Sequence, residues 1–383
     1  MGRQRTNNSI VKVLHLIDSL DLGGAQTLML GWLEAYDRSR FRVEIAALHG
    51  SQRSLFNDRV AKLEVPVHFL SPHKYLPLYI PLLIRLLRTR GYDVVHCHLF
   101  AANWLGKPLA RLMRVPVVIS HDHCNDRWRV ERCWVRRTDA FCNRFADRIF
   151  AVGETVRDFL VSAEHLPPDR VEVILNGVPD RDVPVRQPAT QSRRIGGAGR
   201  LVSQKNFDRF LWIARELVRL DPSYEFVIAG SGPQEQMLKA TAARLALPAR
   251  WLGNLPSLDD FYSEIDCFLL TSDFEGLPMV LLEALQLGIP VAATAVDGSA
   301  TYFHEVALLL DPSTNPTDLA QEIHRYLADQ PLVQERVALG KQLVLERFSA
   351  ERQIRTIEAR YLALLEGKRY ARGSRKDRTL YVV

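Results

Sequence analysis

The chain of 383 residues is longer than one hydrophobic core usually covers, so we expect two domains of similar size. Its hydrophobic fraction of 47% and charged fraction of 25% are typical of a soluble globular protein. No apolar run is long enough to span a bilayer, and residues 1–8 are polar rather than the core of a signal peptide. These features argue against a membrane-spanning or secreted protein and predict a cytoplasmic one.

The net charge of +6 is unevenly distributed. Residues 1–180 contain 25 basic and 19 acidic residues, whereas residues 181–383 contain 25 of each, including a basic stretch at 368–378. Such asymmetry suggests a face that meets a membrane surface, a lipid phosphate or a nucleic acid, although a generally basic surface explains it equally well. The five cysteines are an odd number without regular spacing, which predicts reduced thiols.

The first half alternates short β-branched runs with helical patterns, which predicts βαβ units around a parallel sheet. We expect strands at 11–17, 43–47, 94–97, 117–119 and 149–152, and helices at 26–36, 81–90, 101–113 and 154–162. Residues 179–193 lack periodicity and are rich in proline, arginine, aspartate and glutamine, as expected of a linker.

The alternation of strands and helices then restarts. We expect strands at 195–198, 226–229, 267–270 and 291–294, and helices at 207–220, 234–245, 278–287 and 319–327. The sequence therefore predicts an α/β protein of two Rossmann-like, doubly wound domains facing across a cleft. The expected divisions are an N-terminal domain at 1–178, the linker at 179–193, a second domain at 194–350, and at 351–383 a helix that packs back on the first domain, followed by a basic tail.

Ligands of such sheets bind beyond the carboxyl ends of the strands, so the loops there are the first candidates for a site. In the first half, Gly23 and Gly24 lie between a strand and a helix, where the backbone can approach an anion closely or simply turn. His121 follows the strand at 117–119. A metal site formed by His121, His123 and Cys124 is conceivable, but no second pair at zinc-ligand spacing accompanies them, so we expect no metal.

The second half carries the most informative stretch, residues 272–284, which follows the strand at 267–270. Glu275 falls in the loop, and Pro278 suits the first turn of a helix whose free N–H groups can bind phosphate or sugar hydroxyls. Glu283 falls within an apolar helix and needs a partner, which could be a ribose, a backbone cap or an arginine. We place Phe274, Gly276 and Leu277 in the same ligand-binding loop.

Two cations flank the loop that opens the second half. Arg200 and Lys205 have a spacing that can straddle a diphosphate, although solvated surface cations at a turn would look the same. Asn206 or Asp208 is the expected cap of the helix that follows. Asn254 and Leu255, which follow Gly253, could line a base pocket or form a tight turn.

Taken together, these motifs resemble family 4 of the retaining glycosyltransferases, also called glycosyl transferases group 1. The resemblance spans roughly residues 11–365 and is specific because several separated motifs coincide. Its motifs are Gly199-Arg200 with Lys205-Asn206, Gly230-Ser231-Gly232-Pro233, Leu252-Gly253, Glu275-Gly276-x-Pro278 with Glu283-Ala284, and Gly288-x-Pro290-Val291.

The resemblance implies a GT-B fold and a UDP-, GDP- or ADP-sugar as donor, without a metal or other cofactor. It implies that Arg200 and Lys205 contact the diphosphate, that Glu275 contacts the donor sugar and that Glu283 contacts the ribose. It also implies that the loop of Gly23 and Gly24 faces the donor phosphate and that His121 lies near the donor sugar. The chain departs from the family at Asp297-Gly298-Ser299-Ala300-Thr301, where a Gly-Gly-x-x-Glu run is common, which puts the support of the donor loop in question.

The expected reaction is transfer of a sugar to a hydroxyl of a glycan or lipid-linked acceptor, in polysaccharide or glycolipid synthesis. Because no carboxylate pair is evident that could flank the anomeric carbon, we expect front-face substitution rather than double displacement. Arg200 and Lys205 would then stabilise the departing diphosphate. Basic amphipathic stretches at 74–90 and 127–144 could hold the protein at the cytosolic face of a membrane, although the first is more simply a sheet-covering helix.

Two other functions fit the same fold. A sugar-nucleotide epimerase would require a carboxylate pair and a histidine around the sugar, which we do not identify in the sequence. A donor-binding subunit without activity would be expected to lack Arg200, Lys205 or Glu275, and all three are present. We expect no nucleic-acid partner, because no aromatic and basic recognition motif accompanies the positive charge.

Overall fold

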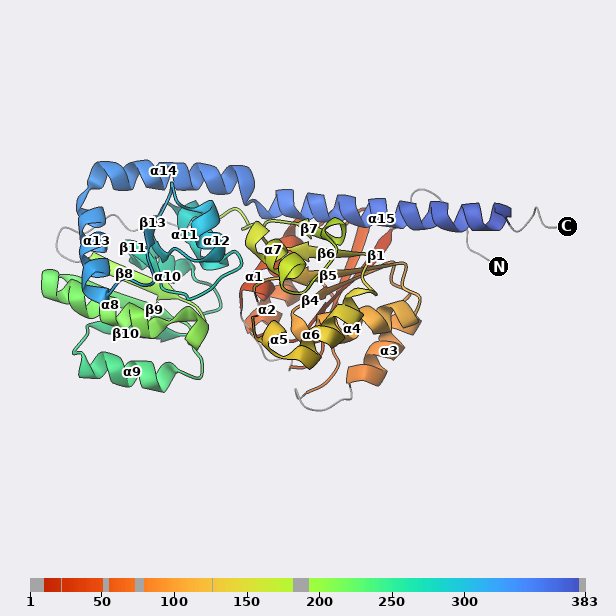
Figure 1. Cartoon of the computed structure of the whole chain (residues 1–383), viewed down its shortest axis with the longest axis horizontal. Helices are drawn as coiled ribbons and strands as arrows, with labels where there is room; N and C mark the ends of the chain where they lie inside the picture. Colours follow the sequence, from red (N-terminus) through yellow and green to blue (C-terminus); the bar gives the residue numbers. More distant parts are fainter. Residues whose placement is uncertain are drawn as a thin grey trace. The chain divides into compact units, whose positions relative to one another are not determined.

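The computed structural model describes residues 10–21, 23–50, 55–72, 79–125, 127–181 and 193–378 (Figure 1). The chain forms two compact units: one of Met1–Leu175 with Ala350–Val383, and one of Asn176–Ser349. The first unit thus ends at Leu175 rather than at residue 178, and residues 179–181 of the expected linker belong to the second unit. The rest of that linker, apart from Arg193, lies outside the described residues.

The first unit contains a seven-stranded parallel sheet in the order β3-β2-β1-β4-β5-β6-β7. Its strands are β1 (Val11–Ile17), β2 (Phe41–Ala47), β3 (Val67–Phe69), β4 (Val94–His98), β5 (Val117–Asp122), β6 (Arg148–Ala151) and β7 (Val171–Val173). Its helices are α1 (Gly24–Ala35), α2 (Leu55–Lys62), α3 (Tyr79–Arg90), α4 (Phe100–Leu112), α5 (Arg127–Glu131), α6 (Cys133–Asn143), α7 (Glu154–Ser162) and α15 (Ala350–Arg378).

The second unit contains a six-stranded parallel sheet in the order β10-β9-β8-β11-β12-β13. Its strands are β8 (Arg193–Ala198), β9 (Tyr224–Ala229), β10 (Ala249–Gly253), β11 (Cys267–Leu270), β12 (Val291–Thr294) and β13 (Leu308–Leu310). Its helices are α8 (Phe207–Leu220), α9 (Glu235–Arg244), α10 (Asp259–Glu264), α11 (Met279–Leu287), α12 (Asp297–Tyr302), α13 (Pro316–Ala328) and α14 (Gln330–Arg347).

Each sheet buries apolar strands under helices, so its strands form nearly continuous hydrophobic runs. The core of the second unit centres on Phe210, Leu217 and Phe226, where α8 packs on the sheet. In the first unit α3 buries Leu83 and Leu87 in the core, so the stretch at 79–90 is a sheet-covering helix. Residues 74–78 of the amphipathic stretch expected at 74–90 lie outside the described residues.

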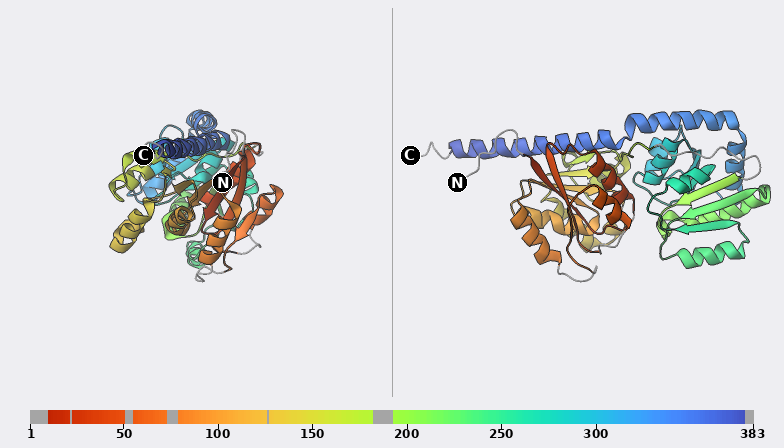
Figure 2. Two further views of the ribbon diagram at one scale, coloured as in Figure 1. Left: turned by 90° about the vertical axis from the view of Figure 1, so that its right-hand side faces the viewer. Right: turned by 180° about the vertical axis from the view of Figure 1, so that it is seen from behind.

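The C-terminal helix α15 packs along the first unit and continues past its sheet (Figure 1 and Figure 2). Trp32 of α1 donates a hydrogen bond of 2.8 Å from Nε1 to Gln353 Oε1 of this helix. Tyr361 is fully buried and its hydroxyl lies 2.6 Å from His96 Nδ1. None of the described helices is long and apolar enough to cross a bilayer.

In both sheets the strand order reverses beside the first strand of the unit. The reversal lies between β1 and β4 in the first sheet and between β8 and β11 in the second. At such a point the crossover helices on either side leave opposite faces of the sheet, which opens a crevice at the carboxyl ends of the strands. The fold therefore directs attention to the loops after these four strands.

Candidate active site

The loops after β8 and β9 approach so closely that two positions accept only glycine. A Cβ on Gly230 would lie 2.0 Å from the carbonyl oxygen of Gly199, and one on Gly232 would lie 2.4 Å from that of Leu201. Both contacts are to backbone atoms, which cannot rotate away. The glycines thus hold the β9 loop against the loop that carries Arg200 and Lys205.

Lys205 and Glu275 meet at the reversal point of the second sheet. Lys205 Nζ lies 2.5 Å from Glu275 Oε1, and Ser272 Oγ donates to the same oxygen at 2.6 Å. Glu275 is only 6% exposed, so the loop after β11 directs its carboxylate inward. The lysine stem runs beside Gly199, whose absent Cβ would lie 3.4 Å from Cε. A buried carboxylate, paired with a cation and a hydroxyl, is thereby fixed in one position.

Asp297, the first residue of α12, supports the Glu275 loop. Its Oδ2 accepts a hydrogen bond of 3.1 Å from the backbone N–H of Glu275. Asp297 has a left-handed φ of 37°, and a Cβ on Gly298 would lie 1.9 Å from the carbonyl oxygen of Gly276. The departure from the Gly-Gly pattern therefore keeps glycine at the close contact and replaces the other glycine with a carboxylate that holds the loop.

Arg200 is exposed, and its guanidinium forms no ion pair with any residue that the structure describes. It lies seven residues before Phe207, where α8 begins, and Asn206 caps this helix by accepting a 3.1 Å hydrogen bond from the N–H of Arg209. Asn206, rather than Asp208, is therefore the cap. The loop presents one cation that is already paired, Lys205, and one that is available to an incoming anion.

Glu283 contacts Arg181 and Tyr262 of its own unit. Its Oε1 lies 3.1 Å from Arg181 Nη2, and its Oε2 accepts a 2.9 Å hydrogen bond from the hydroxyl of Tyr262. Burial and the adjacent carboxylate raise the pKa of Tyr262 well above its usual value. Of the partners that the sequence left open, the arginine is the one observed; a ribose would add to this pair, since each carboxylate oxygen accepts more than one hydrogen bond.

The other residues predicted to bind the donor divide into two groups. Phe274 is partly buried and Gly276 and Leu277 are buried, in the loop between β11 and α11. The carbonyl oxygens of Phe274 and Leu277 already accept hydrogen bonds, at 3.1 Å from Gln204 and at 2.9 Å from Asn176. Asn254 is exposed and Leu255 is partly buried. Both follow β10 at the edge of the sheet, where the carbonyl oxygen of Gly253 accepts a hydrogen bond of 2.7 Å from the N–H of Gly230.

In the first unit, Gly23 and Gly24 begin α1 as the residue pattern suggested. Gly23 has an extended φ of −174°, and a Cβ there would lie 2.8 Å from Oε1 of Gln26. The amide of Gln26 reaches back to the carbonyl of Ser19 at 2.9 Å. Among the described residues no side chain caps this helix, so its first N–H groups remain available to an anion.

His121 lies in a group of five histidines at the carboxyl ends of β1, β4 and β5, which we call the histidine cluster: His15, His96, His98, His121 and His123. Burial lowers the pKa of His15 to about 3 and that of His123 to about 4, and lowers the others well below the usual value. The rings are therefore neutral at neutral pH. Sequence reasoning considered His121 with His123 and Cys124 but missed the cluster, although His98 ends β4 and lies opposite His121 on the neighbouring parallel strand.

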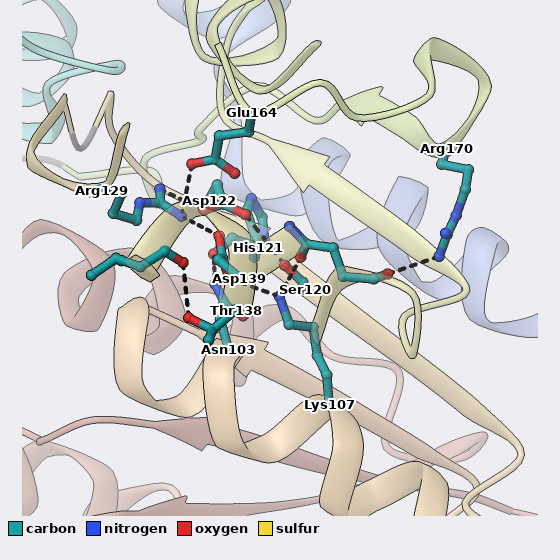
Figure 3. Close-up of polar contacts among 12 residues, drawn as sticks. Asn103, Lys107, Ser120, His121, Asp122, Arg129, Thr138, Asp139, Glu164 and Arg170 are labelled. Atoms are coloured by element: carbon teal, nitrogen blue, oxygen red, sulfur yellow. Dashed lines mark hydrogen bonds and ion pairs between the residues drawn. The ribbon is translucent and has the colours of Figure 1, made fainter. Parts of the chain in front are cut away.

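A buried network of charged side chains lies next to the cluster (Figure 3). Arg129 lies 2.9 Å from Asp122, 3.4 Å from Asp139 and 3.4 Å from Glu164. Lys107 lies 3.7 Å from Asp139. Three carboxylates thus face two cations, and burial raises the pKa of Glu164 to about 8 despite the nearby Arg129. The polar residues at inward positions of α4 and α6 were the signal in the sequence for this network.

Comparisons with known proteins agree with this geometry. The model described as Glycosyltransferase Family 4 matches residues 22–182, and the one described as Glycosyl transferases group 1 matches residues 181–342. The chain is 25% identical over 305 residues to the putative glycosyltransferase EpsF of Bacillus subtilis, covering 74% of this chain and 79% of the relative. It is also 25% identical over 321 residues to an Escherichia coli UDP-Gal:alpha-D-GlcNAc-diphosphoundecaprenol alpha-1,3-galactosyltransferase, covering 77% and 82%.

Among solved structures, Anabaena Alr3699/HepE in complex with UDP and glucose superposes with a TM-score of 0.79. It has 18% sequence identity and covers 92% of this chain and 100% of its own. A sucrose-phosphate synthase from Thermosynechococcus elongatus gives a TM-score of 0.77 at 16% identity, covering 93% and 100%. These likenesses establish the GT-B fold class, two Rossmann-like domains. The chain therefore belongs to the family 4, group 1 glycosyltransferases and is a transferase enzyme.

Proposed function

We propose that the protein transfers a sugar, with retention of configuration, from a nucleotide diphosphate sugar to a hydroxyl group. The observation that carries the proposal is the ordered pair of Lys205 and Glu275 beside the unpaired Arg200, at the reversal point of the second sheet. The diphosphate lies against the two cations. The carboxylate of Glu275 accepts hydrogen bonds from the donor sugar, and Asp297 keeps its loop in place.

The reaction proceeds as a front-face substitution and takes no assistance from a metal. The bond between the anomeric carbon and the diphosphate oxygen breaks, while the acceptor oxygen forms its bond on the same face of the sugar. The departing phosphate oxygen takes the acceptor proton. Arg200 and Lys205 stabilise the charge that develops on the diphosphate, which is the main contribution of the protein to the rate.

The nucleotide is held by the remaining residues of the second unit. Glu283 binds the ribose, and its ion pair with Arg181 keeps the carboxylate ionised and oriented. Phe274, Gly276, Leu277, Asn254 and Leu255 line the nucleotide, while from the first unit Gly23 and Gly24 bind phosphate. His121 forms a hydrogen bond with the donor sugar through Nε2, which has no hydrogen-bond partner within the described chain. UDP is the nucleotide we favour, because the relative and the neighbour named above carry UDP-Gal and UDP in their names.

The acceptor is a glycan or a lipid-linked sugar, and the enzyme works at the cytosolic face of a membrane. The E. coli relative is named for a diphosphoundecaprenol-linked acceptor. Helix α6 supports the membrane proposal, because Trp134 is 64% and Phe141 56% exposed on a face that also carries exposed Arg137 and Arg144. Aromatic and basic side chains on one helical face suit an anionic bilayer.

A thermal-shift panel of UDP-, GDP- and ADP-sugars tests the donor proposal. A donor that binds the native state raises its apparent stability, so we expect the largest shift for a UDP-sugar. Retention is tested separately, by NMR of the anomeric configuration of the product. No shift with any of these donors at millimolar concentration would contradict the donor site, and an inverted product would contradict the mechanism.

A further inference from the structure

Three members of the histidine cluster have the arrangement of a metal site. His98, His121 and His123 each offer a ring nitrogen within 4.8 Å of the other two. The closest pair, His98 Nδ1 and His123 Nε2, is 3.3 Å apart. Two imidazole nitrogens on one tetrahedral zinc ion, at about 2.0–2.1 Å from it, are separated by about 3.3 Å. We propose that His98, His121 and His123 bind a divalent transition metal ion of the zinc class.

The surrounding side chains orient these ligands. His98 directs its other nitrogen, Nε2, to His15 Nδ1 at 2.9 Å, and His15 in turn contacts the hydroxyl of Tyr36 at 2.8 Å. His121 directs Nδ1 to His96 Nε2 at 3.3 Å, and His96 contacts the hydroxyl of Tyr361 as described above. Such outer hydrogen bonds fix the tautomer of a metal-binding histidine and raise its basicity. The same bonds leave the lone pair on Nε2 of His121 free, since this atom has no hydrogen-bond partner among the described residues.

The three histidines also differ in their access to the surface. His123 is half-buried and gives access from the surface, whereas His98 and His121 are closed off. Beyond the ligands lies the buried network, in which Asp122, Asp139 and Glu164 face Arg129 and Lys107 (Figure 3).

This site goes beyond the proposed transferase activity, and the evidence for it does not depend on that activity. The residues belong to the first unit, whereas the cations and carboxylates that hold the diphosphate belong to the second. The two proposals share only the lone pair of His121, which can bind a metal ion or a sugar hydroxyl but not both. Excess Zn²⁺ is therefore expected to reduce donor turnover.

The test is a titration of the full chain with Co²⁺, in reducing buffer and without an affinity tag. We expect one equivalent of Co²⁺ to give the visible absorption of a tetrahedral site with nitrogen ligands, and one equivalent of Zn²⁺ to abolish it. His123→Ala and His123→Asn should each weaken the binding by more than about tenfold. His304→Ala, which alters an exposed histidine outside the cluster, should leave the titration unchanged.

Three results would overturn the metal site. They are the lack of a stoichiometric spectrum for the wild type, a sulfur-to-cobalt charge-transfer band showing that a cysteine binds instead, and equal affinity in both His123 variants and the wild type. The two substitutions at the half-buried position guard against loss of folding in either one. Because the titration needs no sugar donor, its outcome is separate from that of the donor experiments.

Discussion

The two units share a strand order but place opposite chemistry at the point where that order reverses. In the second unit the loops after β8 and β11 bring together Lys205 and Glu275, and the first of these loops also carries the exposed Arg200. In the first unit β1 and β4 bring together neutral imidazoles, His15 and His98, at 2.9 Å. The comparison shows that topology fixes where a site forms, while the residues at strand ends decide whether it holds an anion or offers lone pairs.

Lys205→Ala tests the role of the charged groups in the second unit and should have the largest effect on turnover. Loss of one preorganised group that stabilises developing charge typically costs about 10²–10³ in kcat. It also leaves the buried carboxylate of Glu275 without its cation. Steady-state kinetics with a UDP-sugar would measure the effect. Lys239→Ala, which removes a lysine that is 47% exposed on α9, is the matched control and should keep wild-type activity; equal activity in the two variants would refute the assigned role.

Glu275→Gln should lower turnover by about tenfold to a hundredfold while preserving the fold. The amide keeps the size of the side chain and one acceptor oxygen, but it weakens the charge-assisted bonds to Lys205 and to the donor sugar. Kinetics and the thermal unfolding midpoint should be measured together. A large loss of stability with normal activity per folded molecule would show that the pair serves folding rather than catalysis.

Asp297→Asn probes the support of the Glu275 loop and should have a smaller effect, about threefold to tenfold, mainly on KM. The amide oxygen can still accept the N–H of Glu275, but less strongly than a carboxylate does. Asp297→Gly, which relieves the left-handed φ but removes the acceptor, should be worse than Asp297→Asn if the hydrogen bond matters. The reverse order would indicate that backbone strain is the larger factor.

The buried network of the first unit predicts a pH dependence of stability rather than of chemistry. The pKa of Glu164 rises from 4.5 to about 8 on folding, so the folded state binds this proton more tightly than the unfolded chain. The free energy of unfolding should therefore decrease as the pH rises from about 4.5 to about 8. Asp122, Asp139, Arg129 and Lys107 face this group and set the size of the effect.

Glu164→Gln should flatten that slope, because glutamine stays neutral. Denaturant unfolding at several pH values between 5 and 8.5, at about half-unit intervals, would measure it. If the variant retains the same slope as the wild type, another group carries the pH dependence.

Sequence patterns predicted the fold well where elements are long or buried. The strands β1, β11 and β12 and the helices α7 and α8 have the expected bounds, because continuous apolar runs and clear periodicity mark them. The three-residue strands β3, β7 and β13 were missed, since a segment that short carries no periodicity of its own. Strand β10, which contains Arg250 and lies half-exposed at the edge of the sheet, was missed because its residues are not those that strands favour.

The sequence likewise predicted some residues of the site and not others. Arg200, Lys205 and Glu275 come from loops whose glycines and prolines mark strand ends, so their proximity could be predicted from the order of the strands. The partner of Glu283 could not, because Arg181 is 102 positions away and its contact depends on packing. The histidine cluster was equally hidden. Its members come from three strands, and only the register of β1, β4 and β5 places them side by side.

The most direct test of the central claim compares UDP with uridine by calorimetry. If Arg200 and Lys205 hold the diphosphate, UDP should bind the wild type at least about 100-fold more tightly than uridine, which corresponds to about 2.7 kcal/mol. That ratio should fall most of the way to unity in the Arg200→Ala/Lys205→Ala double variant and persist in Lys239→Ala. An undiminished ratio in the double variant would contradict the assignment of the diphosphate to this pair.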